Sequence, residues 1–299
     1  MKYSNKISIG TAQFGLDYGI TNNKGRILFP EVLKILKIAQ DNNISKIDTA
    51  RSYGVAEETL GKAIHDHENF KITTKFYIDK NYLCQTEKVK EWEKIFSKSL
   101  KNLNTKKIDT LLIHNPNNIM KNQYEILFDW LFHLKEKNLI NNIGVSIYKK
   151  EDLNNVNLKN IDVVQLPFSI YDQRLFLDGT IKSLYENQIL IQARSIFLQG
   201  LLLQPINKWP NCLSKSFKIH HQNCQISLKE LNINPIEAAL SFPLKCKYLD
   251  SLIVGLSSLG DFKQILDQIS KIQNNEYNNL TTNFSWSNEE DLDPRNWKL

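Results

Sequence analysis

Residues 108–145 read IDTLLIHNPNNIMKNQYEILFDWLFHLKEKNLINNIGV, and this stretch holds two short apolar runs around a longer amphipathic one. Ile108 to Ile113 and Asn142 to Val145 are short and aliphatic, which is typical of buried strands. Between them, Gln123 to Asn138 places apolar residues three and four positions apart, as in a helix that packs by one face. The stretch therefore predicts a strand, helix, strand unit.

The same alternation continues in both directions from this unit. We expect eight strands: 6–11, 46–49, 71–75, 108–113, 142–145, 162–165, 189–193 and 251–254. We expect helices at 30–42, 56–65, 86–103, 123–138, 149–155, 235–242 and 260–271. Eight such units without a long linker favour an α/β fold, a closed parallel (β/α)8 TIM barrel, as one domain over residues 1–299. A doubly wound dinucleotide-binding sheet is disfavoured because no G-x-G-x-x-G follows the first strand.

Two segments interrupt the alternation. The first is a long loop at 199–227, after the seventh strand, and the second is a polar C-terminal tail at 274–299. Loops after barrel strands lie on the catalytic face, so we expect the long loop to form a lid or a pocket wall. We expect the tail to pack across one rim of the barrel.

Composition excludes several classes of protein. The 299 residues include 38 Lys plus Arg and 32 Asp plus Glu, a net charge of +6, and the basic residues are scattered. Nucleic-acid binding is therefore not expected. No apolar run approaches the roughly 20 residues of a membrane-spanning helix, and the first ten residues lack a signal segment, so we expect no membrane partner and a cytoplasmic location. The four cysteines are far apart and are expected to stay reduced.

Four polar side chains follow three neighbouring strands. Asp48 ends the second predicted strand and Tyr53 follows it, Lys75 ends the third, and His114 follows the fourth. Barrel enzymes carry their chemistry at the carboxyl ends of the strands, so these side chains should meet at one mouth. A phenol has an ordinary pKa near 10, and we expect the Lys75 cation to lower that of Tyr53. Asp48 would orient Lys75 and His114 would hold a substrate oxygen, an arrangement that suits protonation of a carbonyl.

The segment Asp48-Thr49-Ala50-x-x-Tyr53-Gly54-x-x-Glu57-x-x-Leu60-Gly61 resembles the signature of aldo-keto reductases. Further segments resemble that family in the same order: 10–15 (GTAQFG), 74–75 (TK), 108–114 (IDTLLIH), 143–146 (IGVS), 163–165 (VVQ), 195–202 (SIFLQGLL) and 254–258 (VGLSS). The resemblance implies an NAD(P)H-dependent oxidoreductase that reduces an aldehyde or ketone, sugar-like compounds included, with Tyr53 as general acid. Lys75 and Asp48 would tune Tyr53, and His114 would orient the carbonyl.

The resemblance also implies where the cofactor lies. Ser146 and Gln165 would hold the nicotinamide carboxamide, and Arg194 takes the place of the aromatic residue that commonly stacks on the nicotinamide. A planar guanidinium can stack, but its charge disfavours the positively charged oxidised ring. The remaining cofactor contacts implied for this chain are Gly10, Thr11, Ser195, Gly200, Leu201, Gly255, Ser257 and Ser258.

The cofactor implied by the family is NADPH, and this sequence also predicts use of NADH. Asp261 occupies the apparent place of an arginine that binds the 2′-phosphate, and a carboxylate repels a phosphate. Ile147 and Ile265 replace two further asparagines of the family pattern.

Three other interpretations would account for part of these residues. Asp48 and Lys75 alone would suggest a structural ion pair. A nicotinamide-binding sensor or regulatory subunit would lack turnover, and a barrel enzyme of phosphorylated substrates would leave Tyr53 and His114 unexplained.

No metal site is expected, because neither His65-x-His67 nor the pair His220 and His221 beside Cys224 has ligand spacing. We expect a monomer that acts on a small carbonyl substrate.

Overall fold

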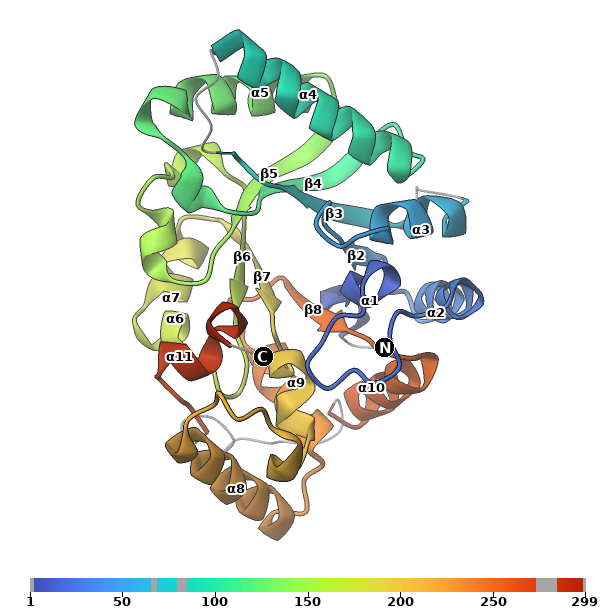
Figure 1. The fold of residues 1–299 in the computed structure, drawn as a ribbon, viewed down its shortest axis with the longest axis vertical. Coiled ribbons are helices and arrows are strands. Elements are labelled where there is room, and N and C mark those ends of the chain that lie inside the picture. Colours follow the sequence, from blue (N-terminus) through green and yellow to red (C-terminus); the bar gives the residue numbers. More distant parts are fainter. Residues whose placement is uncertain (1–2, 66–68, 80–84, 273–283, 298–299) are drawn as a thin grey trace.

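Eight parallel strands close into a barrel in chain order (Figure 1). The computed structural model describes residues 3–65, 69–79, 85–272 and 284–297. The strands are β1 (Ile7–Gly10), β2 (Lys46–Asp48), β3 (Lys71–Phe76), β4 (Ile108–Ile113), β5 (Ile140–Ser146), β6 (Val163–Pro167), β7 (Leu190–Arg194) and β8 (Ser251–Gly255). Pairing of β1 with β8, with Ile7 opposite Leu252 and Gly10 opposite Gly255, closes the ring. The eight strands expected from the sequence are confirmed, with ends that move by one or two residues.

Helices surround this sheet (Figure 1). They are α1 (Ala12–Gly15), α2 (Phe29–Asp41), α3 (Ala56–Ala63), α4 (Gln85–Asn102), α5 (Tyr124–Glu136), α6 (Arg174–Leu177), α7 (Thr180–Glu186), α8 (Lys215–Glu230), α9 (Pro235–Lys245), α10 (Leu259–Ile272) and α11 (Glu289–Leu292). Six of the seven predicted helices are confirmed, as α2 to α5, α9 and α10. The seventh, at 149–155, is a short 3-10 segment, Lys150–Leu153.

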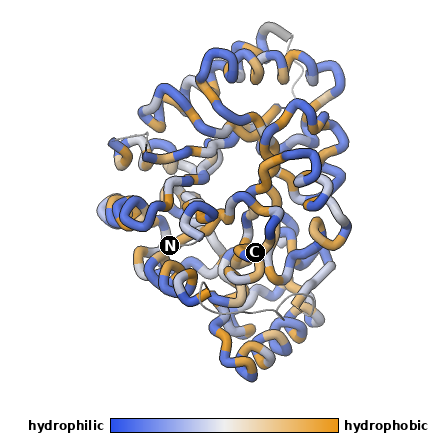
Figure 2. The backbone as a smooth tube through the Cα atoms, turned by 180° about the vertical axis from the view of Figure 1, so that it is seen from behind, coloured by the Kyte–Doolittle hydropathy of each residue, from blue (hydrophilic) through white to orange (hydrophobic). Residues whose placement is uncertain are grey.

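The outer helices pack on the barrel by one apolar face. In α10 the buried residues recur every three or four positions, as Phe262, Ile265, Ile269 and Ile272 do. Figure 2 shows the resulting alternation of hydrophilic and hydrophobic residues along the helices. Close packing inside the sheet also explains Gly144, because a Cβ atom there would lie 2.3 Å from the carbonyl oxygen of Val163. None of the described helices has the length and apolarity that crossing a membrane requires.

The segment expected as a long loop at 199–227 contains regular structure, so this prediction was wrong. It begins in a 3-10 segment, Leu198–Leu203, and its second half forms most of α8. Ser214 caps α8 by accepting a hydrogen bond from the backbone N–H of Phe217 at 3.1 Å. The buried positions of α8, which include Phe217 and Leu228, follow helical spacing, but the many polar residues between them mask it in the sequence.

The described part of the tail, residues 284–297, packs on the barrel as predicted. The backbone N–H of Trp286 donates to the carbonyl of Tyr171 at 2.8 Å. Asp291 accepts hydrogen bonds from the backbone N–H and the hydroxyl of Ser214, at 2.8 and 2.7 Å. Residues 274–283 of the predicted tail lie outside the described residues. The tail therefore joins the rim of the barrel to the start of α8.

Candidate active site

A cavity of about 650 Å³ lies at the carboxyl ends of the strands. Its walls include Asp48, Tyr53 and His114 from the predicted catalytic set, while Lys75 is buried behind them. The structure thus brings the four predicted residues together.

Asp48 and Lys75 form a buried ion pair. The Lys75 Nζ lies 2.7 Å from both carboxylate oxygens of Asp48 and donates a third hydrogen bond to the carbonyl of Thr49 at 2.9 Å. Gln165 also donates to Asp48 Oδ1, at 2.7 Å. Burial lowers the pKa of Lys75 and the adjacent Asp48 carboxylate opposes that shift. The carboxylate therefore compensates the lysine charge and fixes the direction of its N–H groups.

Tyr53 is positioned by a close contact between the end of α1 and the turn before α3. Gly54 has a φ of +56°, and a Cβ atom there would lie 2.4 Å from the carbonyl oxygen of Gly15. A Cβ atom on Gly15 would in turn collide with the Tyr53 carbonyl oxygen at 1.8 Å. Only glycine permits this approach, so the pair of glycines places the phenol at the mouth.

The phenol oxygen of Tyr53 lies 3.5 Å from Lys75 Nζ. Burial and the charge of Asp48 raise the pKa of Tyr53, and the cation that opposes this rise is Arg194. The sequence predicted that Lys75 lowers this pKa. The net shift is upward instead, because burial and the Asp48 charge outweigh the opposing cation, so the expected lowering does not occur and Tyr53 keeps its proton at neutral pH.

His114 begins the loop after β4. Its backbone N–H donates to the carbonyl of Phe76 at 2.8 Å, and its ring stacks on Tyr77 with centroids 4.5 Å apart. Burial, followed by the charges of Lys75 and Arg194, lowers the pKa of His114 from 6.5 to about 3. The imidazole is therefore neutral. Its Nδ1 is buried and has no hydrogen-bond partner among the described residues.

Most residues predicted to contact a cofactor line the same cavity. These are Gly10, Thr11, Gln165, Arg194, Ser195, Gly200, Gly255 and Ser257. Ser146, Leu201 and Ser258 do not lie on its wall: Leu201 is fully buried in the core, and Ser258 accepts a hydrogen bond from the backbone N–H of Asp261 at 3.1 Å.

Two buried polar atoms fit the amide of a nicotinamide. Ser146 Oγ and Gln165 Oε1 have no hydrogen-bond partners within the described ranges. Buried polar groups are nearly always paired in folded proteins, so two such atoms at the ends of adjacent strands indicate that a ligand supplies the partners. A carboxamide can donate to Gln165 Oε1 and bond the Ser146 hydroxyl. The residues present therefore fit the implied cofactor.

Two carboxylates occupy the start of α10, which borders the cavity. Asp261 accepts hydrogen bonds from the backbone N–H and the hydroxyl of Ser257, at 3.1 and 2.6 Å. Glu31 accepts a hydrogen bond from the backbone N–H of Leu259 at 2.5 Å. A helix start normally offers such donors to an anion. Here two carboxylates of the chain itself, Asp261 and Glu31, accept hydrogen bonds from the donors at this helix start.

Sequence reasoning missed several residues of the cavity wall. Thr21 comes from the loop after β1, Tyr148 follows β5, and Pro294 comes from the tail. Tyr148 lies two positions after Ser146, so the resemblance could have identified it. The position of Pro294 on the cavity wall could not be predicted from the sequence, because a tail beyond the last helix has no fixed place on a barrel. No group of metal-binding side chains occurs in the parts of the chain that the structure describes, which exclude His67.

Comparison with known proteins agrees with this geometry. The sequence profile described as "Aldo/keto reductase family" matches residues 6–282. The chain belongs to the aldo/keto reductase family. It is an NAD(P)H-dependent oxidoreductase of small carbonyl compounds, as its family membership implies.

Solved structures share the fold. The holo form of the aldo-keto reductase AKR11C1 from Bacillus halodurans has a TM-score of 0.72 at 18% identity, covering 94% of this chain and 93% of that one. The thermostable aldo-keto reductase Tm1743, in complex with the inhibitor epalrestat, has a TM-score of 0.66 at 22% identity, covering 88% and 89%. No curated protein sequence matches the chain.

Proposed function

We propose that this chain reduces an aldehyde or ketone to the alcohol with Tyr53 as the general acid. The observation that carries the proposal is the contact of Tyr53 Oη with Lys75 Nζ, at 3.5 Å, on the wall that also carries His114. Because burial raises its pKa, Tyr53 holds a proton at neutral pH. It can give this proton to a carbonyl oxygen as negative charge develops there.

The other residues of the set orient this proton transfer. Asp48 fixes Lys75, and the Lys75 ammonium, whose Nζ lies 3.5 Å from the phenol oxygen, would stabilise by its charge the phenolate that remains after transfer. Neutral His114 donates a hydrogen bond to the carbonyl oxygen and polarises it without competing for the Tyr53 proton.

The cofactor supplies a hydride to the carbonyl carbon when it is bound. Ser146 and Gln165 would hold its carboxamide, and Gly255 and Ser257 would lie along its phosphates and adenosine. Gln165 also donates to Asp48, so the residue that places the nicotinamide is hydrogen-bonded to the residue that orients Lys75. This link would align the hydride donor with the proton donor.

We propose that the enzyme uses both NADPH and NADH and discriminates weakly between them. NADPH is the usual cofactor of the family. Asp261 and Glu31, however, occupy the donors at the start of α10, where the resemblance places the 2′-phosphate. A cytoplasmic location and a monomeric state remain predictions from the sequence.

The test is loss of absorbance by reduced nicotinamide, with each cofactor, against a panel of aldehydes, hydroxylated sugar-like aldehydes and ketones. Turnover of at least one compound, lost in Tyr53→Phe, is expected. Cofactor binding is measured in parallel by quenching of tryptophan fluorescence. Tight binding without turnover of any compound would contradict the proposal and favour a nicotinamide-binding regulatory subunit.

A further inference from the structure

Arg194 lies at the carboxyl end of β7 and lines the cavity together with Tyr53 and His114. Its side chain makes only neutral contacts. One Nη donates to the carbonyl of Ile147 at 2.8 Å and the other to Ser195 Oγ at 3.4 Å. Among the described residues no carboxylate pairs with it, so its positive charge is uncompensated.

Two other arginines of this rim are paired with carboxylates. Arg174 makes a two-point contact with Asp172 at 2.8 Å, and Arg295 makes one with Asp293. Placing an arginine in a partly buried position costs desolvation energy, which a carboxylate partner normally offsets. Arg194 lacks such a partner at the place where the cavity reaches the proposed proton donor; among the described residues Arg51, after β2, is also unpaired and donates only to the carbonyl of Ile95, at 3.4 Å.

The guanidinium of Arg194 is held in place by a stack. Its Cζ lies 3.9 Å from the ring centroid of Tyr148, and the Cζ of Arg295 lies 3.5 Å from the same centroid. Two guanidinium groups cannot occupy one face at these distances, so they lie on opposite faces of the ring. Tyr148 is thus fixed between a strand end and the tail.

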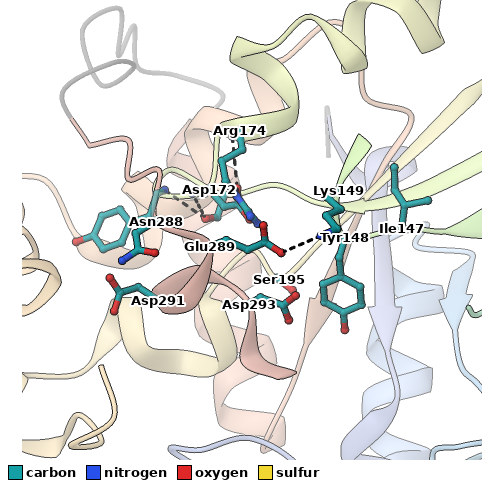
Figure 3. Close-up of polar contacts among 12 residues, drawn as sticks. Ile147, Tyr148, Lys149, Asp172, Arg174, Ser195, Asn288, Glu289, Asp291 and Asp293 are labelled. Carbon is teal, nitrogen blue, oxygen red and sulfur yellow. Dashed lines mark hydrogen bonds and ion pairs between the residues drawn. The ribbon is translucent and has the colours of Figure 1, made fainter. Parts of the chain in front are cut away.

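An ion pair with the tail also holds this wall of the cavity in place. Figure 3 shows Tyr148 and Lys149 beside the tail, with Lys149 Nζ directed at Glu289 at 3.7 Å. Asp293 belongs to the same tail segment and pairs with Arg295. The Arg194 guanidinium therefore faces the cavity from a preorganised wall, and a ligand does not have to break an ion pair to reach it.

The charge of Arg194 acts on the reacting position. It lowers the pKa of both Tyr53 and His114, the two groups that would hold the carbonyl oxygen. Asp48 and Lys75 form an ion pair that is neutral as a whole, although Asp48 raises the pKa of Tyr53 and Lys75 lowers that of His114. One net positive charge thus remains near the carbonyl position.

We propose that Arg194 binds a carboxylate of the carbonyl substrate, so that the enzyme reduces oxo acids whose carboxylate lies close to the aldehyde or ketone group. This inference rests on the proposed function. A single planar cation matches a planar, singly charged carboxylate. The assignment moves Arg194 from the cofactor, where the resemblance placed it, to the substrate.

The reaction balances without a further reactant. The carbonyl carbon gains the hydride of the reduced nicotinamide, and the carbonyl oxygen gains the Tyr53 proton. The product is a hydroxy acid whose carboxylate is unchanged. Its negative charge would also offset the positive charge of the oxidised nicotinamide near the Arg194 cation.

The experiment compares 2-, 3- and 4-carboxybenzaldehyde with their methyl esters, which keep the size but lose the charge. The readout is the kcat/KM of each acid divided by that of its ester. For the best isomer we expect this ratio to fall at least about 10-fold in Arg194→Met, as for loss of a charge-assisted hydrogen bond. Arg194→Lys should restore part of it, because lysine keeps the charge but not the planar fork.

Lys34→Met is the matched control, because it removes one positive charge from an exposed position on α2 and should leave the ratio unchanged. Equal loss for acids and esters in Arg194→Met would overturn the inference. So would a loss confined to cofactor affinity, measured by fluorescence quenching, since Arg194 would then bind the cofactor.

Calorimetric binding of the three acids to the cofactor complex separates this inference from the proposed function. If the native chain turns over neither these acids and esters nor any compound of the wider carbonyl panel, the proposed function fails. In that case, tighter binding of an acid to the native chain than to Arg194→Met still supports binding of its carboxylate by Arg194. Equal binding to both overturns it.

Discussion

The cavity has two charged regions of opposite character. Near Tyr53, the Arg194 cation has no carboxylate partner among the described residues. At the start of α10, Asp261 on the cavity wall and Glu31 outside that wall place two carboxylates on the backbone N–H groups that a helix start offers to anions. The first region therefore attracts negative charge and the second repels it. We therefore expect the enzyme to recognise an anion at the reacting end of the cavity. We also expect it to bind NADPH, with its 2′-phosphate, without strong preference over NADH.

The largest effect, on the free energy of unfolding, is expected at the buried ion pair of Asp48 and Lys75 beside the first region. Lys75→Met leaves the Asp48 carboxylate buried with Gln165 and without its cation. Removing one partner of a buried ion pair typically costs about 3–5 kcal/mol, so the free energy of unfolding should fall by about that amount. Urea unfolding at pH 7 measures it.

The double variant Asp48→Asn, Lys75→Met is the control for this prediction. It removes both charges and should recover most of the lost stability. A single variant that loses less than about 1 kcal/mol would mean that water reaches Asp48, and that the two side chains do not compensate each other's charge.

Tyr53→Phe tests the chemistry of the same region. Removing a general acid should lower kcat/KM at least about 100-fold, while the dissociation constant of the cofactor stays within about 3-fold of native. Tyr77→Phe is a matched control, because Tyr77 stacks on His114 but is absent from the cavity wall. It should keep most of the activity. If Tyr53→Phe retained near-native turnover, another group would donate the proton.

Much of this region could be predicted from the sequence. Strand ends of a parallel barrel share one face, so the positions of Asp48, Lys75 and His114 in the chain were enough to place them together. Tyr53 required the spacing of a family signature, because nothing in a five-residue turn specifies where a phenol points. The glycines that fix it, Gly15 and Gly54, lie at the end of α1 and in the turn before α3.

The charge balance could not be predicted in the same way. The direction of the pKa shift of Tyr53 depends on how deeply the phenol is buried and on which charges lie beside it, and both are set by tertiary contacts. The helix α8 was hidden because its buried positions are few and separated by polar residues. The stack of Arg295 on Tyr148 joins residues 147 positions apart and has no local signal.

The pH dependence of stability gives a smaller effect. Folding lowers the pKa of His114 from 6.5 to about 3, so the folded state binds fewer protons than the unfolded state in that range. This contribution is fully present above pH 6.5 and is lost as the pH falls toward 3. It amounts to at most about 2 kcal/mol between pH 6.5 and pH 5. His114→Gln should flatten the fall in unfolding free energy between pH 7 and pH 5, and an unchanged slope would mean that the folded imidazole is protonated.

The smallest effect concerns the second region. Asp261 holds Ser257 through both its N–H and its hydroxyl, so neither group is free for a 2′-phosphate. A carboxylate near a phosphate costs roughly 1 kcal/mol per contact in a solvated site, so the native chain should discriminate between NADPH and NADH by less than about 100-fold. Asp261→Asn keeps an acceptor for Ser257 and removes the charge, and it should tighten NADPH binding by about 5-fold with little change for NADH. Asp261→Arg should move the ratio further toward NADPH. Dissociation constants from quenching of tryptophan fluorescence measure both, and a thousandfold native preference for NADPH would show that the 2′-phosphate binds away from Asp261.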